Sequence, residues 1–307
     1  MMRERLTALV LVSALLTGAF GMTRPAQPWV QGMQENLFWL KKMQWNREFD
    51  IALAGDSRMF RGVSPEDLDR SLPGLRIANY GFSGCGFSRP YLDAIGGILD
   101  PRSKQRIIVL GVTPHSLTPN AARNNGYIDK KNLDPFSAWV FLTFPGISTY
   151  LKPYSSVEMR MLTGGPPLAK YYARYHASGW VASRKDPEDP REALEEYRRM
   201  FEGGNTVDPA QEDELASYVR KWRAQGIRVI GFRPPVSREM LELETRISGF
   251  DEARFVNKFK AAGGVWLDID QTGYHSYDGS HLEEKAARRF SRDLGTAIAD
   301  ALKNPAN

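Results

Sequence analysis

The sequence of 307 residues contains a single cysteine, Cys85, and only four histidines. One cysteine excludes an intramolecular disulfide and any metal site built from several cysteines. The histidines show no metal-binding spacing such as His-x-x-x-His, so we predict no metal ion and no other cofactor. The chain also lacks a block of basic residues. Its formal net charge of +5 is spread along the sequence and gives no sign of a nucleic-acid-binding face.

Long hydrophobic runs are scarce, and the clearest one lies at the N-terminus. Arg3 and Arg5 precede a stretch without charged residues from 6 to 22. A basic flank before an apolar run is typical of a signal peptide or signal anchor, and this run is just long enough to span a membrane. The two arginines predict a cytoplasmic N-terminus and an extracytoplasmic body, in the periplasm or at the cell surface. A cleavage site at 19–21 would release the protein, so anchor and signal peptide both remain open for residues 1–26.

The rest of the chain alternates strand-length apolar runs with helical patterns. Five short, unbroken and mostly β-branched runs are typical of strands buried on both faces of a parallel sheet: 49–54, 75–79, 106–110, 227–232 and 265–269. Helical patterns occupy 65–72, 89–99, 212–225 and 283–302. This alternation predicts an α/β fold with a doubly wound, five-stranded, mostly parallel sheet. Ligands of such sheets bind beyond the carboxyl ends of the strands.

The segment from about 115 to 208 does not follow the alternation. It is rich in Tyr, Trp, Phe, Pro and Gly and lies between the third and fourth predicted strands. We predict that it is an insertion, within a single domain formed by residues 27–307. Its aromatic residues could form a sugar-stacking platform or the core of the insertion itself: Trp139, Tyr150, Tyr154, Tyr171, Tyr172 and Trp180.

Two short motifs carry the chemistry of the sequence. Gly55-Asp56-Ser57 directly follows the first predicted strand, which presents a serine hydroxyl at the carboxyl edge of the sheet. A serine is a weak nucleophile at neutral pH and needs an adjacent base. Only His281 has an obvious orienting acid close in sequence, Asp278, in a short loop before the last helix. We therefore predict a catalytic triad of Ser57, His281 and Asp278, in which the carboxylate orients the imidazole.

These motifs resemble those of the SGNH/GDSL hydrolase superfamily, over most of the chain from about 49 to 302. The resemblance gives Ser57 the role of nucleophile, His281 that of base and Asp278 that of acid. It also implies a flavodoxin-like three-layer sandwich. The resemblance extends to divergent, membrane-anchored SGNH-like proteins that work beside membrane-bound O-acyltransferases in modifying surface polymers.

The resemblance also implies an oxyanion hole, to which the backbone N–H of Ser57 contributes. The second motif of the superfamily is matched by residues 79–84, and its glycine donor corresponds best to Gly84, with Gly81 as the alternative. The third motif departs from the usual Gly-x-Asn-Asp, because this chain has Gly-Val-Thr-Pro at 111–114. Thr113 takes the place of the asparagine, and we expect its hydroxyl to be the third donor.

Two arginines follow strands at the same edge. Arg58 comes after the nucleophile and Arg233 after the fourth strand, and both are candidates for binding an anionic or hydroxyl-rich substrate or for a structural role. Cys85 is expected to be a small buried residue.

The sequence thus leaves three functions open. The first is an esterase acting on acyl, most plausibly acetyl, esters of an exported or cell-surface carbohydrate. The second is a polysaccharide O-acyltransferase that works with a membrane-bound O-acyltransferase. The third is a non-catalytic scaffold or glycan-binding protein of the same fold, attached to the membrane by its N-terminal segment.

Overall fold

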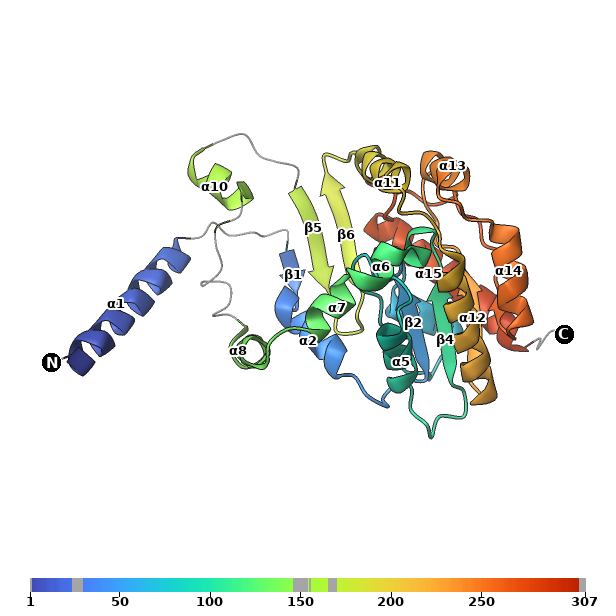
Figure 1. Cartoon of the computed structure of the whole chain (residues 1–307), viewed down its shortest axis with the longest axis horizontal. Helices are drawn as coiled ribbons and strands as arrows, with labels where there is room; N and C mark the ends of the chain where they lie inside the picture. Colours follow the sequence, from blue (N-terminus) through green and yellow to red (C-terminus); the bar gives the residue numbers. More distant parts are fainter. Residues whose placement is uncertain (1, 24–29, 146–153, 155, 165–169, 304–307) are drawn as a thin grey trace.

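A five-stranded, all-parallel sheet forms the centre of the protein. The computed structural model describes residues 2–23, 30–145, 154, 156–164 and 170–303. The strands are β2 (Ile51–Gly55), β3 (Ile77–Asn79), β4 (Ile107–Gly111), β7 (Arg228–Phe232) and β8 (Val265–Trp266), in the order β3-β2-β4-β7-β8 (Figure 1). All five predicted strands are confirmed. The last is shorter than predicted and ends at Trp266.

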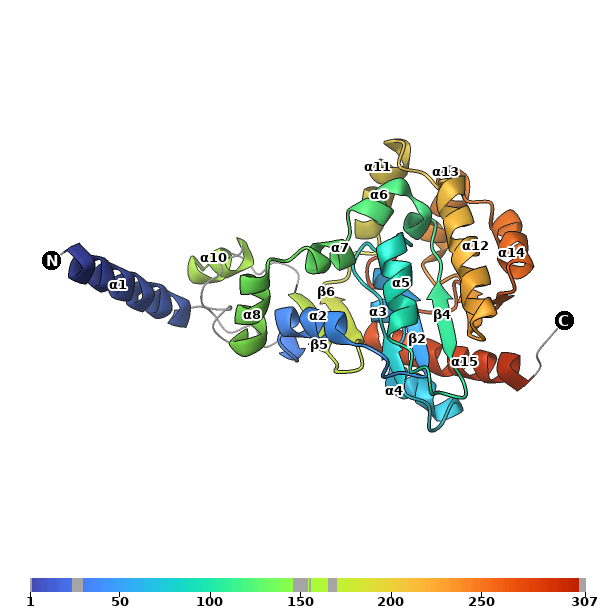
Figure 2. The ribbon, with the colours of Figure 1, turned by 60° about the horizontal axis from the view of Figure 1, so that its bottom comes forward.

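Helices cover both faces of this sheet, as Figure 2 shows. One face packs against α5 (Arg89–Gly97), α12 (Pro209–Ala224) and α14 (Glu252–Ala261), and the other against α3 (Ser57–Gly62), α4 (Pro65–Leu68) and α15 (Glu284–Lys303). Successive strand residues point to opposite faces. In β4, Ile108 and Leu110 join the first core, whereas Ile107 and Val109 join the second. The predicted flavodoxin-like three-layer sandwich is confirmed.

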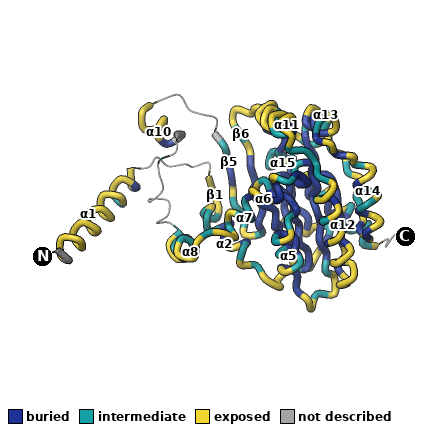
Figure 3. Tube along the Cα trace, in the orientation of Figure 1, coloured by how far each residue is buried: buried dark blue, intermediate teal, exposed yellow. Residues whose placement is uncertain are grey.

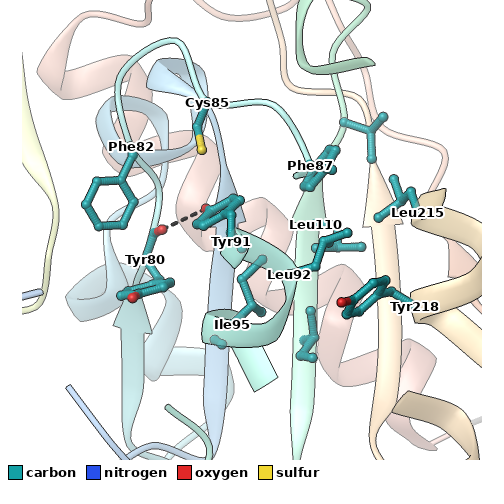
Figure 4. Close-up of a cluster of buried hydrophobic side chains, with 14 of the residues drawn as sticks. Tyr80, Phe82, Cys85, Phe87, Tyr91, Leu92, Ile95, Leu110, Leu215 and Tyr218 are labelled. Atoms are coloured by element: carbon teal, nitrogen blue, oxygen red, sulfur yellow. Dashed lines mark hydrogen bonds between the residues drawn. The ribbon is translucent and has the colours of Figure 1, made fainter. Parts of the chain in front are cut away.

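The sheet and the inner sides of its helices are buried, as Figure 3 shows. The first core is rich in aromatic side chains, and Figure 4 shows a part of it around Tyr80, Phe82 and Tyr91. The hydroxyl of Tyr91 donates to the carbonyl of Tyr80 over 2.7 Å, so this polar group is paired within the core. Cys85 lies in the same cluster with no exposed surface, and the prediction of a small buried residue is confirmed.

The ends of two helices follow from their sequence. Ser64 caps α4 by accepting a hydrogen bond from the backbone N–H of Asp67. The predicted helix 65–72 continues only as a 3₁₀ turn, η1 (Asp69–Ser71). Gly226 follows α12 with a φ of +75°, a conformation that glycine adopts at helix C-termini.

The insertion between β4 and β7 is largely helical and adds a second, smaller sheet. It contains η2 (His115–Leu117), α6 (Pro119–Arg123), α7 (Gly126–Lys131), α8 (Pro135–Thr143), α10 (Ser156–Leu162), β5 (Lys170–Tyr175), β6 (Val181–Asp186) and α11 (Glu192–Glu202). β5 pairs antiparallel with β6 and parallel with β1 (Val30–Gly32), which precedes α2 (Glu35–Gln44). The sequence did not predict this sheet, because β1 is only three exposed residues long.

The aromatic residues of the insertion do not form a single platform. Trp180 is fully buried and Trp139 is exposed, while Tyr171 and Tyr172 are half-buried on β5. Tyr150 lies outside the described residues.

The N-terminal helix α1 (Met2–Met22) projects from the body (Figure 1). Residues 4–22 form a helix long and apolar enough to cross a membrane, and 6% of its most apolar window is buried. This agrees with a signal anchor or a signal sequence and leaves the choice between them open. A further pair of helices, α13 (Arg238–Ile247) and α14, fills the connection between β7 and β8.

Candidate active site

A strand–turn–helix unit positions Ser57 at the carboxyl edge of the main sheet. Ser57 is the first residue of α3, and a single residue, Asp56, separates it from the end of β2. Gly55 has a φ of +152°, and a Cβ atom there would lie 2.7 Å from the carbonyl oxygen of Gly111 in the neighbouring strand. Asp56 caps α3, because its Oδ1 accepts from the backbone N–H of Arg58 over 3.0 Å.

The loop before α15 brings two further side chains to Ser57. His281 Nε2 lies 2.8 Å from Ser57 Oγ, and His281 Nδ1 lies 2.6 Å from Asp278 Oδ2. The other carboxylate oxygen of Asp278 accepts from the backbone N–H groups of Ser280 and His281 at 2.9 and 2.7 Å. The three residues predicted as a triad therefore form one continuous hydrogen-bonded chain. A nucleophile, a base and a group that orients the base need this arrangement.

The protonation states fit a base that accepts a proton. Burial alone would raise the pKa of Asp278, but the charge and hydrogen bonds of His281 outweigh it and lower this pKa to about 2. Burial lowers the pKa of His281 below its ordinary value, and the neighbouring Asp278 only partly opposes this effect. At neutral pH the imidazole is therefore neutral and the carboxylate is ionised.

Two backbone N–H groups near Ser57 are available to stabilise an oxyanion. Within the part of the chain that the structure describes, the N–H groups of Ser57 and Gly84 have no hydrogen-bond acceptor. The N–H of Gly81, the alternative donor, is occupied, because it donates to Asn79 Oδ1 over 3.1 Å. The amide of Asn79 in turn donates to the carbonyls of Met59 and Val63 and holds the C-terminal end of α3. These contacts favour Gly84 over Gly81.

The contacts of Thr113 do not support its predicted role as an oxyanion donor. Its hydroxyl donates to Asp56 Oδ2 over 2.6 Å and accepts from the backbone N–H of Ser116 over 3.0 Å. A hydroxyl has one proton to donate, and here the buried carboxylate of Asp56 takes it. Burial would raise the pKa of Asp56, but the neighbouring His115, the positive charge of Arg58 and the hydrogen bond from Thr113 lower it overall. Thr113 thus holds an ionised carboxylate beneath the nucleophile.

His115 lies next to the carboxylate of Asp56, although no role was predicted for it from the sequence. Its Nδ1 lies 3.8 Å from Asp56 Oδ2, and its Cε1 would lie 3.9 Å from a Cβ atom placed on Gly84. The Nδ1 atom is buried and has no hydrogen-bond partner within the described residues. The sequence feature that could have indicated a role for His115 is its position directly after the Thr-Pro pair that follows β4.

Arg58 and Arg233 face the protein interior, which corrects their prediction as substrate-binding residues. Their side chains are 1% and 3% exposed. Arg58 Nη2 and Arg233 Nη2 donate to the two carboxylate oxygens of Glu244 at 2.6 and 2.9 Å. Arg58 Nε also donates to Ser280 Oγ over 2.9 Å, in the loop that carries the base. Both arginines are therefore structural, and Arg58 links α3 to the loop that carries Asp278 and His281.

A cavity of about 240 Å³ lies between the smaller sheet, α2, α3 and α7, and none of Ser57, Asp278 and His281 lines it. Its wall includes Trp39, Arg61, Ser83, Lys130 and Tyr171, and Ser83 immediately precedes Gly84. Arg61 Nη1 donates to the hydroxyl of Tyr277 over 2.7 Å, and the ring of Tyr277 stacks on that of His281 with centroids 6.0 Å apart. The cavity wall is thereby connected to the catalytic base.

A larger cavity of about 620 Å³ lies elsewhere. It is lined by Arg228 and Val265, the first residues of β7 and β8, and so lies at the amino edge of the sheet, opposite Ser57. Among the described residues, no group of three or more His, Cys, Asp or Glu side chains is placed to hold a metal ion.

Comparisons with known proteins give no relative. No family model matches the chain, and neither a curated protein nor a solved structure does.

Proposed function

We propose that this protein is a serine esterase of the SGNH type that acts on acyl esters of an exported or cell-surface carbohydrate. The observation that carries the proposal is the hydrogen-bonded chain from Ser57 Oγ through His281 to Asp278 at the carboxyl edge of the sheet. The buried carboxylate, the neutral imidazole and the two free backbone N–H groups support the same chemistry.

The proposed reaction proceeds through an acyl-enzyme. His281 Nε2 takes the proton of Ser57 while Oγ attacks the ester carbonyl carbon, and the N–H groups of Ser57 and Gly84 stabilise the oxyanion. Collapse of this intermediate breaks the ester bond, and His281 gives its proton to the departing sugar oxygen. His281 then takes a proton from the acceptor, which is water in an esterase, and the acceptor oxygen attacks the acyl carbonyl carbon. Collapse of this second intermediate breaks the bond to Ser57 Oγ, which regains its proton from His281, and releases the acyl product.

The cavity of about 240 Å³ supports a carbohydrate substrate, because its wall is linked to His281 through Arg61 and Tyr277. Trp39 and Tyr171 contribute aromatic surface to its wall, while Arg61, Ser83 and Lys130 contribute polar groups. Ligand sites commonly combine an apolar and aromatic lining with a few polar groups that fix orientation. The apolar helix α1, as a signal sequence or anchor, supports an extracytoplasmic location.

A transferase differs from an esterase only in the second half-reaction. If the acceptor is a sugar hydroxyl in place of water, the same residues make the protein an O-acyltransferase, with a membrane-bound O-acyltransferase as its partner. The N-terminal apolar helix favours this second candidate, because it would hold the site beside the membrane. A non-catalytic scaffold is less well supported, because Ser57 Oγ and His281 Nε2 lie only 2.8 Å apart.

The experiment that tests catalysis uses the purified full chain and p-nitrophenyl acetate. We expect release of nitrophenol and an acetyl adduct by intact mass, both absent in Ser57→Ala. Ser217→Ala is the matched control, because Ser217 is an exposed serine on α12 and should leave both signals unchanged. Faster loss of the adduct in sugar than in water would identify a transferase. Neither release nor an adduct, with acetyl and longer acyl donors, would refute catalysis.

A further inference from the structure

The helix α8 is apolar and only partly covered, because it contacts α2 while the rest of its surface is exposed. Its nine residues, Pro-Phe-Ser-Ala-Trp-Val-Phe-Leu-Thr, carry no charge, and none of them is buried. The exposed fractions are 71% for Phe136 and 53% for Trp139, and Phe144, directly after the helix, is 42% exposed. A helix that is hydrophobic on all sides is normally covered by protein or by lipid. Much of the apolar surface of α8 therefore has no cover from the described residues.

Two aromatic side chains of α8 and the one directly after the helix form a continuous surface, which we call the aromatic ridge: Phe136, Trp139 and Phe144. The ring centroids of Phe136 and Trp139 are 6.0 Å apart, and those of Trp139 and Phe144 are 5.7 Å apart. Adjoining exposed rings of this kind mark an interaction surface, whereas isolated exposed apolar residues are ordinary.

The ridge lies close to the end of the N-terminal helix. In both ribbon views, α8 and α10 flank the C-terminal end of α1, and the axis of α8 runs across the direction of α1 (Figures 1 and 2). The segment before α10 contacts α1 directly, because the Tyr154 hydroxyl lies 2.6 Å from the Phe20 carbonyl oxygen and 2.7 Å from Thr23 Oγ1. α10 itself exposes Met159, Met161 and Leu162.

We propose that the aromatic ridge and α10 lie in the outer headgroup region of a membrane that α1 spans. A helix lying flat at the end of a spanning helix is at the depth of this interface. Tryptophan is enriched there, and apolar helices bind there through buried apolar area. Lys131 ends α7, just before α8, and its charge suits the phosphate groups of lipid headgroups. This proposal rests on α1 spanning the membrane and does not depend on the esterase reaction.

The test places a fluorescent reporter on the ridge of the full chain. Cys85 is fully buried, so a cysteine introduced at the surface can be labelled selectively with the environment-sensitive dye NBD. Trp139→Cys and Phe136→Cys give two independent positions on the ridge. Thr245→Cys, an exposed site on α13, is the matched control. The labelled chains are reconstituted in vesicles of phosphatidylethanolamine and phosphatidylglycerol, with or without a phosphatidylcholine that carries a nitroxide on its acyl chain.

The proposal predicts opposite responses on the ridge and at the control. The nitroxide lipid should quench NBD at both ridge positions several-fold more strongly than at Thr245→Cys, and iodide in the buffer should quench it several-fold less. Equal quenching at all three positions would overturn the proposal. Protection from iodide without quenching by the nitroxide lipid would also overturn it, because the ridge would then be covered by protein.

Discussion

Arg58 Nε donates to Ser280 Oγ over 2.9 Å, so the residue after the nucleophile is bonded to the residue before the base. The guanidinium also donates to Glu244, which pairs with Arg233 in turn. This buried network therefore fixes α3 relative to the catalytic loop. Its members come from α3, α13, the position directly after β7 and the loop before α15.

The first prediction concerns this network. Arg58→Met keeps an unbranched side chain but leaves Glu244 with one buried partner in place of two, which should lower the free energy of unfolding by about 3–5 kcal/mol. Activity per folded molecule should fall mainly in kcat, because the loop that carries His281 loses its hydrogen bond to α3. Urea unfolding and ester kinetics measure the two effects.

Arg89→Met is the control, because the exposed Arg89–Glu214 pair should contribute less than about 1 kcal/mol. Wild-type stability in Arg58→Met would refute the structural role.

The second prediction is the pH dependence of the reaction. Catalysis needs an unprotonated His281, and burial lowers the pKa of this histidine below the ordinary value of 6.5. The value of kcat/KM should therefore be constant near neutral pH and fall only below pH 6.5 as the imidazole gains a proton. A pH–rate profile with p-nitrophenyl acetate measures the midpoint. A midpoint at or above 6.5 would contradict this assignment.

The third prediction separates the two roles considered for Thr113. Thr113→Val removes the hydroxyl that donates to the buried Asp56, and this loss should cost about 1–3 kcal/mol of unfolding free energy. The folded-state pKa of Asp56 is lowered, so its ionised form adds stability above the ordinary Asp pKa. The deficit of the variant should therefore be largest at neutral pH and shrink in acid.

Thr113→Ser, which keeps the hydroxyl, is the control and should behave like the wild type. Thermal unfolding of the three proteins, from neutral pH into acid, measures the loss of stability. A loss of kcat in Thr113→Val without any loss of stability would instead restore Thr113 as an oxyanion donor.

The fourth prediction tests the backbone donor at Gly84. Gly84 has a φ of +58°, so Gly84→Ala should cost about 1–2 kcal/mol for a left-handed residue. Gly74→Ala is matched in backbone, with a φ of +80° and open space around the added Cβ, but Gly74 lies in the exposed turn before β3. Both variants should be destabilised similarly. Only Gly84→Ala should lower kcat, by up to about 10²-fold if its N–H moves away from the oxyanion. Equal kcat values in the two variants would exclude Gly84 as a donor.

The main sheet could be predicted from sequence because its strands are buried on both faces. A run such as Ile107–Leu110 is apolar at every position, so its length and composition define it without knowledge of its neighbours. The grouping of Ser57, Asp278 and His281 could also be predicted, because one motif follows a strand and the other precedes a helix. Both then lie at the carboxyl edge.

The surroundings of the site could not be predicted in this way. Glu244, the partner of Arg58, is 186 residues away in sequence and lies on a helix whose packing no local pattern reveals. The buried carboxylate of Glu244 binds the guanidinium of Arg58 and so gives Arg58 a structural role. From the sequence alone, an arginine beside a nucleophile is equally typical of substrate binding. The role of the Thr113 hydroxyl could not be predicted either, because tertiary contacts alone orient it toward Asp56.

The pairing of β1 with β5 affects how the protein is made. Gln31 and Arg174, which are hydrogen-bonded across these strands, are 143 residues apart. At ordinary rates of translation β1 is complete about 7–30 s before its partner exists. An unpaired strand is a template for aggregation, and a very short strand is one protection against it. The three-residue length of β1 thus allows the nascent chain to wait for β5 without pairing with another chain.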